Sequence, residues 1–178
     1  MNYNNFTIKA QEALQKAISL AQSANQQIIE PAHLLKAVML VGENITTFIF
    51  SKLGVNTRTL EMALDREIES YPKVSGGDPM LSRETNAVMQ KAAHFASKME
   101  DQYGSLEHLL LAILSEKSTA SQMLKDAGVT EQHLQMAIDE LRKGEKVTSQ
   151  SAEDTYQSLS KYAENLTEKA REGKLDPV

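Results

Sequence analysis

The chain has 178 residues, enough for one domain of ordinary size or for two small halves that share a core. Its formal net charge of -5 argues against general binding to nucleic-acid phosphates, which requires clustered Lys and Arg. The absence of cysteine excludes disulfides, thiol catalysis and thiolate metal sites.

The composition indicates a helical protein of the cytoplasm. Aromatic residues make up only 5% of the chain, whereas Ala, Leu, Gln, Glu and Lys are plentiful, which favours helices over strands. Residues 1–5 have neither the basic nor the apolar region of a signal peptide. The longest apolar runs, such as residues 38–41, are far too short to span a bilayer. We therefore expect a cytoplasmic protein that binds neither nucleic acid nor membrane.

The first predicted helices are set by capping residues and by helical spacing. Thr7 can cap the first helix with its hydroxyl, and apolar residues then recur at helical spacing as far as Ala24. The second helix is predicted to begin at Pro31, because proline suits the first helical position.

Two shorter helices are predicted to follow. The third spans residues 45–53 and ends at Gly54, which can adopt the left-handed cap. The fourth is predicted to start after Thr57 and to run to about Tyr71. No credible strand is found along the chain.

The chain contains an internal repeat. His33-Leu34-Leu35-x-Ala37 recurs as His108-Leu109-Leu110-x-Ala112, at an offset of 75 residues. Gly54-Val55 recurs as Gly128-Val129 at an offset of 74, so the second copy has lost one residue, which we place after its second helix. In the second copy, Ser82 is the predicted cap of the first helix, and the second helix begins after Ser105. The third spans residues 119–127 and ends at Gly128, and the fourth starts after Thr130 and runs to about Lys143.

These elements predict an all-α fold, a pseudo-twofold tandem repeat of two four-helix motifs plus a C-terminal connector helix. The repeats are residues 1–71 and 81–143, joined by the Pro/Gly-rich linker 72–80. We expect the halves to pack on each other and to leave a groove where they meet. Residues 144–178 are predicted to be a flexible polar linker followed by a helix at about 156–172, which is expected to be disordered or loosely docked in isolation.

The repeated His-Leu-Leu-x-Ala unit resembles the Clp N-terminal repeat domain of AAA+ chaperones and unfoldases. Tyr-Pro-Lys-Val-Ser-Gly at 71–76 is similar to the ClpB-type disaggregase branch, and the ending 170–178, with Leu-Asp-Pro-Val, resembles the segment that leads into the first ATPase module. Residues 163–165, Ala-Glu-Asn, depart from the Gly and Asp expected there. No Gly-x-x-x-x-Gly-Lys-Ser/Thr phosphate loop occurs, so we expect a fragment of a longer protein.

The resemblance implies a domain that weakly engages exposed hydrophobic stretches of unfolded or aggregated polypeptides and passes them to the pore of a hexamer. ATP, magnesium, a homohexamer and an Hsp70-type partner are implied only for the longer protein, whereas the fragment is expected to be monomeric and to lack a cofactor and a catalytic site. The alternative is an N-domain that docks a folded adaptor in a protease-coupled Clp unfoldase. A stand-alone enzyme is disfavoured, because no nucleophile–base pair, metal set or phosphate loop can be assembled.

Several polar residues are candidates for the site. His33 and His108 are repeat-equivalent, but neither has a second ligand four residues on, which favours a structural role over a metal site. The resemblance implies that Thr7, Asp101 and Glu107 border the substrate site. Thr7 is equally a plain N-cap, and Glu107 suits the positive end of its helix.

Several apolar residues are also candidates for the substrate site. Met89, Phe95, Met99 and His108 are expected near the groove between the repeats. Core packing is the alternative for Phe95 and Met99. Flexible Met side chains suit the binding of varied apolar segments, because they repack around different shapes.

Overall fold

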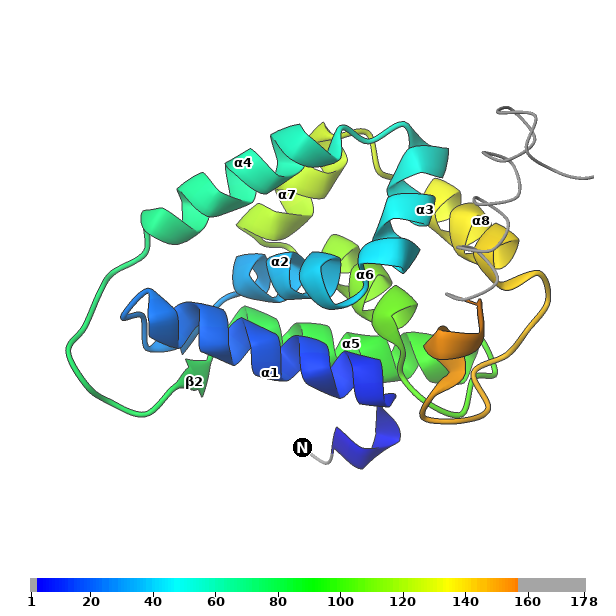
Figure 1. The fold of residues 1–178 in the computed structure, drawn as a ribbon, viewed down its shortest axis with the longest axis horizontal. Coiled ribbons are helices and arrows are strands. Elements are labelled where there is room, and N and C mark those ends of the chain that lie inside the picture. Colours follow the sequence, from blue (N-terminus) through cyan, green and yellow to red (C-terminus); the bar gives the residue numbers. More distant parts are fainter. Residues whose placement is uncertain (1–2, 157–178) are drawn as a thin grey trace, which may run out of the picture.

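The computed structural model describes residues 3–156, and within them the chain forms eight α-helices (Figure 1). The all-α prediction is confirmed. The first copy supplies α1 (Ile8–Ser23), α2 (Pro31–Val41), α3 (Glu43–Leu53) and α4 (Thr57–Glu69). The second copy supplies α5 (Arg83–Lys98), α6 (Leu106–Ser115), α7 (Thr119–Asp126) and α8 (Glu131–Arg142). A 3₁₀ turn (Tyr3–Asn5) and two-residue strands β1 (Ile28–Ile29) and β2 (Met80–Leu81) complete the described elements.

The predicted N-caps of the first helix in each copy are confirmed. The Thr7 hydroxyl accepts from the backbone N–H of Ala10 at 3.1 Å, and the Ser82 hydroxyl accepts from that of Thr85 at 3.1 Å. At α4 the cap is Asn56 rather than Thr57. The Asn56 side chain lies one residue earlier and accepts from the third amide, as a short carbonyl side chain does readily.

Two short ladders relate the copies by a pseudo-twofold axis. β1 pairs in parallel with β2, so that Ile29 lies opposite Leu81, and a separate parallel bridge joins Phe6 to Gly104. With the offset of 75 residues, Phe6 corresponds to Leu81 and Gly104 to Ile29. Each ladder therefore joins the residues before the first helix of one copy to those before the second helix of the other. Hydropathy could not show strands of two residues.

The helices of the two copies pack across each other rather than separately. α3 contacts α8, and its counterpart α7 contacts α4, while α2 and α6 contact one another. One hydrophobic cluster extends through both copies. Figure 1 shows the linker from α4 to β2 and the segment after α8 at opposite ends of the molecule. The copies thus share one core, and the residue limits given above for two repeats remain predictions.

The segment after α8 differs from its prediction. Val147, Ala152 and Tyr156 are buried, and residues 152–156 are helical. The expectation of a flexible linker is therefore wrong for residues 147–156, because three isolated apolar anchors in a polar stretch hold it to the core. The predicted helix at 156–172 lies outside the described residues, apart from its first.

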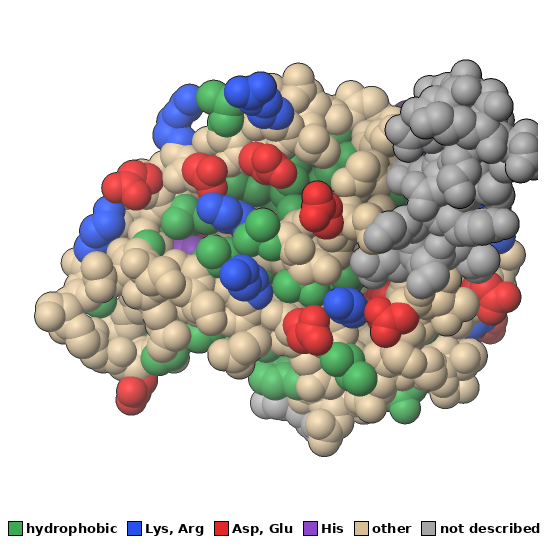
Figure 2. Space-filling model, in the orientation of Figure 1, with side chains coloured by type: hydrophobic (Ala, Val, Ile, Leu, Met, Phe, Trp, Pro, Cys, Tyr) green, Lys and Arg blue, Asp and Glu red, His purple; other side chains and the backbone are tan. Residues whose placement is uncertain are grey.

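Neither the surface drawn in Figure 2 nor the lengths of the helices indicate a particular function. On the face drawn in Figure 2, hydrophobic side chains are interspersed with both acidic and basic ones. In the described part of the chain, no single helix is both long and apolar enough to cross a membrane. The pair α2 and α3 meets that requirement by length and composition only, with a bend of 104° between them.

Candidate functional site

Four of the predicted site residues lie together where α6 begins. Thr7, Glu107 and His108 are 0% exposed and Asp101 is 8% exposed. They belong to a buried polar cluster that also contains Arg142 from the end of α8. The site residues are therefore gathered, but they are gathered inside the protein.

Arg142 links the two acidic residues. Its Nη1 donates to Asp101 Oδ2 at 2.8 Å, and its Nη2 donates to Glu107 Oε2 at 2.8 Å. Burial alone would lower the pKa of Arg142, but the charge of Glu107 and the hydrogen bonds to both carboxylates raise it above its usual range. The guanidinium thus keeps its charge and balances the carboxylates around it.

The two repeat-equivalent histidines cap their helices in the same way. His108 Nδ1 accepts from the Ser105 backbone N–H at 2.8 Å, so Nε2 carries a proton and donates to Asp101 Oδ2 at 2.8 Å. His33 Nδ1 accepts from the backbone N–H of Glu30 at 2.9 Å, and its Nε2 lies 2.7 Å from Gln26 Oε1. This geometry supports the structural role favoured for both residues.

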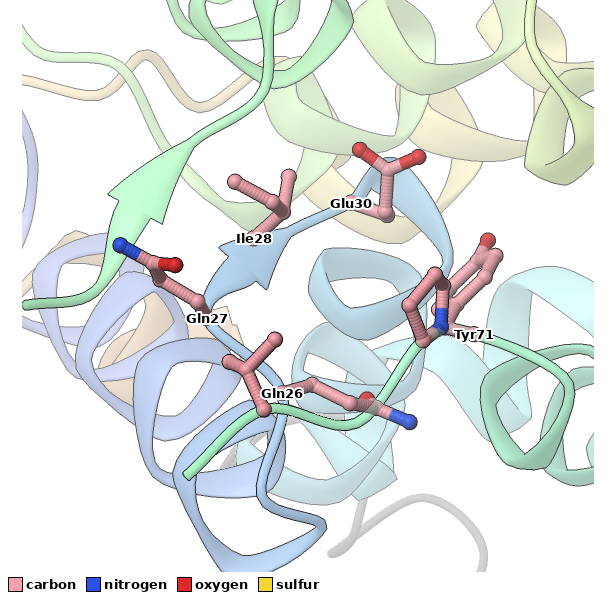
Figure 3. Close-up of a pocket in the computed structure, with 7 residues that line it drawn as sticks. Gln26, Gln27, Ile28, Glu30 and Tyr71 are labelled. Carbon is pink, nitrogen blue, oxygen red and sulfur yellow. The ribbon is translucent and has the colours of Figure 1, made fainter. Parts of the chain in front are cut away.

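The two copies differ in charge at this place. In the first copy Gln26, Ala32 and Ile68 stand where the second has Asp101, Glu107 and Arg142. A small hollow of about 210 Å³ borders this part of the first copy. Its lining includes Gln26, Gln27, Ile28, Glu30 and Tyr71 (Figure 3). The ionic cluster is thus a property of the second copy alone.

Residues 146–156, hereafter the cover segment, close over the cluster. The Val147 backbone N–H donates to Asp101 Oδ1 at 2.9 Å. Glu153 Oε2 accepts from the Thr7 hydroxyl and from the Leu106 backbone N–H, the latter at 3.2 Å. The Tyr156 hydroxyl donates to Glu107 Oε2 at 2.8 Å. Thr7, Asp101 and Glu107 therefore each form a hydrogen bond with the cover segment.

The cluster perturbs the carboxyl groups in opposite directions. Burial and the charge of Glu107 raise the pKa of Glu153 to about 7. Burial would also raise the pKa of Asp101, but hydrogen bonds from His108, Val147 and Arg142 hold it well below its usual range. The Oε1 atoms of Glu107 and Glu153 are buried without a hydrogen-bond partner, so the cluster holds more carboxylate than its donors satisfy.

The apolar candidates separate into two groups. Met89 is 1% exposed and His108 is 0% exposed, so neither side chain is accessible to a client in this structure. Both are buried residues of α5 and α6, helices that contact α2 of the first copy. Phe95 is partly exposed and, with Met99 and Met136, lines an open hollow of about 470 Å³ between α5 and α8. A role of these residues in substrate binding remains a prediction.

Sequence reasoning missed Arg142, Glu153 and Tyr156. One signal was available for Arg142: its counterpart in the first copy is the buried Ile68, so a charge stood at a core position. No comparable signal existed for the other two, because they follow the last repeated helix and have no periodic pattern.

The fold and the site together define a helical repeat domain with an asymmetric polar cluster and no phosphate loop in its sequence. The model of the Clp repeat (R) N-terminal domain matches residues 5–127 and 105–175. The chain belongs to the Clp repeat N-terminal domain family.

Similar proteins agree with this assignment. All 178 residues align with the chaperone protein ClpB of Bacteroides thetaiotaomicron at 64% identity and with that of Porphyromonas gingivalis at 59%. The chain spans 21% of the length of each of these relatives. The Hsp104 N-terminal domain of Candida albicans has a similar fold, with a TM-score of 0.74 at 22% identity over 84% of this chain and 99% of that one.

Proposed function

We propose that this chain binds exposed hydrophobic segments of unfolded or aggregated polypeptides, here called clients, as the N-terminal domain of an ATP-dependent disaggregase. The open hollow between α5 and α8 carries the proposal. Phe95, Met99 and Met136 line it, and Met136 is 60% exposed. Aromatic and Met side chains provide apolar contact that adapts to different shapes, as a sequence-tolerant site requires.

Comparison of the two copies supports the second copy as the client-binding side. The counterparts of Phe95 and Met99 are Leu20 and Ala24, which are smaller. They line a hollow of about 390 Å³ that also contains the ion pair between Lys36 and Asp65. Large adaptable apolar side chains are therefore concentrated on one side of the pseudo-twofold axis.

The longer protein would supply the remaining activity. ATPase modules of the AAA+ type bind ATP and magnesium with a phosphate loop, and no such loop occurs in this sequence. In a hexamer, six tethered domains raise the effective concentration of binding sites, so each site can be weak. Delivery to the pore, cooperation with an Hsp70-type chaperone and a cytoplasmic location belong to this proposal for the longer protein.

The test is a titration of the ¹⁵N-labelled chain with casein, an unfolded model client. We expect dissociation constants of micromolar or weaker, on the order of 10⁻⁶ M or above, and shifts at Phe95, Met99 and Met136. Met136→Gln should weaken binding several-fold, because it removes exposed apolar surface from the hollow. Met62→Gln is the matched control, since Met62 is the repeat-equivalent of Met136 and is 55% exposed on α4.

Two results would count against the proposal. Absence of shifts in the hollow at high casein concentration would refute client binding there. Capture of a single folded partner at one-to-one stoichiometry would instead favour the adaptor-docking alternative, in which the N-domain grips a folded protein.

A further inference from the structure

The cover segment occupies the polar residues that the family resemblance places at the client site. Val147 bonds to Asp101, Glu153 to Thr7 and Tyr156 to Glu107. Asp101, the most exposed of the three candidate residues, is 8% exposed. A client therefore cannot reach these side chains while the cover segment is in place.

The cover segment is held partly through its backbone, as a bound peptide would be. The carbonyl of Val147 accepts from the backbone N–H of Gln102 at 2.8 Å, and the carbonyl of Gln150 accepts from that of Ile8 at 2.8 Å. Backbone donors of this kind read no side chain, so any extended polypeptide can use them. The same groups are thus suited to a client segment.

The cover segment is attached by buried apolar side chains, but one buried carboxyl group opposes its attachment. Val147, Ala152 and Tyr156 are its buried hydrophobic side chains. Its fourth buried residue, Glu153, has one oxygen without a partner and lies in the electrostatic field of Glu107. A buried carboxyl group in these surroundings opposes closure, so release requires less free energy than its number of hydrogen bonds suggests.

The covered cluster also adjoins the open hollow. Lys146 Nζ donates to the backbone carbonyl of Met99, a residue of the hollow, at 2.7 Å. Asp101 follows Met99 by two residues. Displacement of the cover segment would therefore free the Met99 carbonyl beside the hollow and one oxygen of Asp101 two residues further on.

We propose that the cover segment is an intramolecular competitor of the client, and that an extended client segment binds by displacing it from Thr7, Asp101 and Glu107. The competing segment offers carbonyl oxygens to Gln102 and Ile8 and places an apolar side chain where Val147 lies. This inference rests on the proposed function, because it concerns how the same client would reach the polar residues beside the hollow.

A reversible crosslink tests the competition. Ile8→Cys with Gln150→Cys joins the cover segment to α1 at a point where the two backbones are hydrogen-bonded, and the wild-type chain has no cysteine of its own. The oxidised variant should bind casein at least about tenfold more weakly than the same variant after reduction, a loss of about 1.4 kcal/mol or more. Equal binding by the two forms would overturn the inference and leave the proposed function intact. Absence of binding by the reduced variant and by the wild-type chain would refute the proposed function itself.

A second pair of variants requires no crosslink. Tyr156→Phe removes only the hydroxyl that donates to Glu107, and it should strengthen casein binding by about threefold, because the competitor is held less firmly. Tyr71→Phe is the matched control, since its hydroxyl bonds to Glu67 outside the cover segment, and casein binding should not change. Unchanged or weaker casein binding by Tyr156→Phe would contradict displacement.

Discussion

Arg142 donates two hydrogen bonds to one oxygen of Glu107, from Nε at 3.2 Å and from Nη2 at 2.8 Å, and both side chains are buried. The same guanidinium also bonds to Asp101. Arg142→Met should therefore lower the free energy of unfolding by about 3–5 kcal/mol, because it leaves two buried carboxylates without their counterion. Urea denaturation at neutral pH measures the change.

A surface pair provides the control for this prediction. Lys52 lies 3.0 Å from Glu140 and joins α3 to α8 across the two copies, but both side chains are about half exposed. Lys52→Met should cost less than about 1 kcal/mol. Asp101→Asn with Glu107→Gln should restore much of the stability lost in Arg142→Met, and failure of this rescue would show that lost packing, rather than unpaired charge, is the cause.

The pH dependence of stability should contain two opposing contributions. The pKa of Glu153 is raised to about 7 from 4.5, so between these values the folded state keeps a proton that the unfolded state releases, and stability falls as pH rises. Burial and the charge of Lys36 lower the pKa of His33 to about 4 from 6.5, so between these values the unfolded state holds the extra proton, and stability rises with pH. The two effects overlap between about pH 4.5 and 6.5 and should largely cancel in the wild-type chain.

Single substitutions separate the two contributions. Glu153→Gln should leave the His33 effect, so that stability increases by about 1–3 kcal/mol from pH 4.5 to 6.5. His33→Asn should leave the Glu153 effect and reverse that slope. The low pKa of Asp101 acts below this window, because its contribution is lost only as acid protonates it. Urea unfolding at half-unit pH intervals gives the slopes, and parallel profiles for all three proteins would contradict the assignment.

Thr7 and Ser82 are equivalent N-caps with different second partners. The Thr7 hydroxyl bonds to Glu153 in the cover segment, whereas the Ser82 hydroxyl bonds to Thr85 within its own helix. Thr7→Ala and Ser82→Ala should each cost about 0.5–2 kcal/mol through loss of the cap. Only Thr7→Ala should speed amide hydrogen exchange at Ile8, whose N–H bonds to the cover segment. Faster exchange at Ile8 in Ser82→Ala as well would show that the two caps are not independent.

The repeated architecture could be predicted because its signals are local. Thr7, Ser82 and Gly54 mark helix ends through their own chemistry, and the two copies reinforce each other's periodicity. Pseudo-twofold packing followed from the repeat, because two equivalent apolar faces can bury each other.

The closed state of the site could not be predicted in the same way. It depends on Arg142 meeting Asp101 and Glu107, and on Glu153 meeting Thr7, across long stretches of chain, and no local pattern links them. The stretch around Val147 reads as a polar linker because its anchors are isolated. Tertiary contacts, rather than propensity, decide whether such a segment docks.

Gly104 packs against the Phe6 ring so closely that there is no room for a side chain at this position. A Cβ atom at Gly104 would lie 2.6 Å from Phe6 Cδ1 and 2.7 Å from Cε1, and Phe6 is 2% exposed. Gly104→Ala should therefore destabilise the chain by about 1–3 kcal/mol, as overpacking does. At the pseudo-equivalent pair Ile29 stands in place of Gly104 and Leu81 in place of Phe6, so a residue larger than glycine lies opposite one smaller than phenylalanine.

The pairing of Ile29 with Leu81 suggests that Phe6→Leu can compensate for Gly104→Ala. Phe6→Leu should cost less in the Gly104→Ala background than in the wild type, because the smaller side chain makes room for the new methyl group. A double-mutant cycle by urea denaturation measures the coupling, which should exceed about 0.5 kcal/mol. Additive costs would mean that the Phe6 ring moves aside freely, and the ladder between Phe6 and Gly104 would then not depend on the glycine.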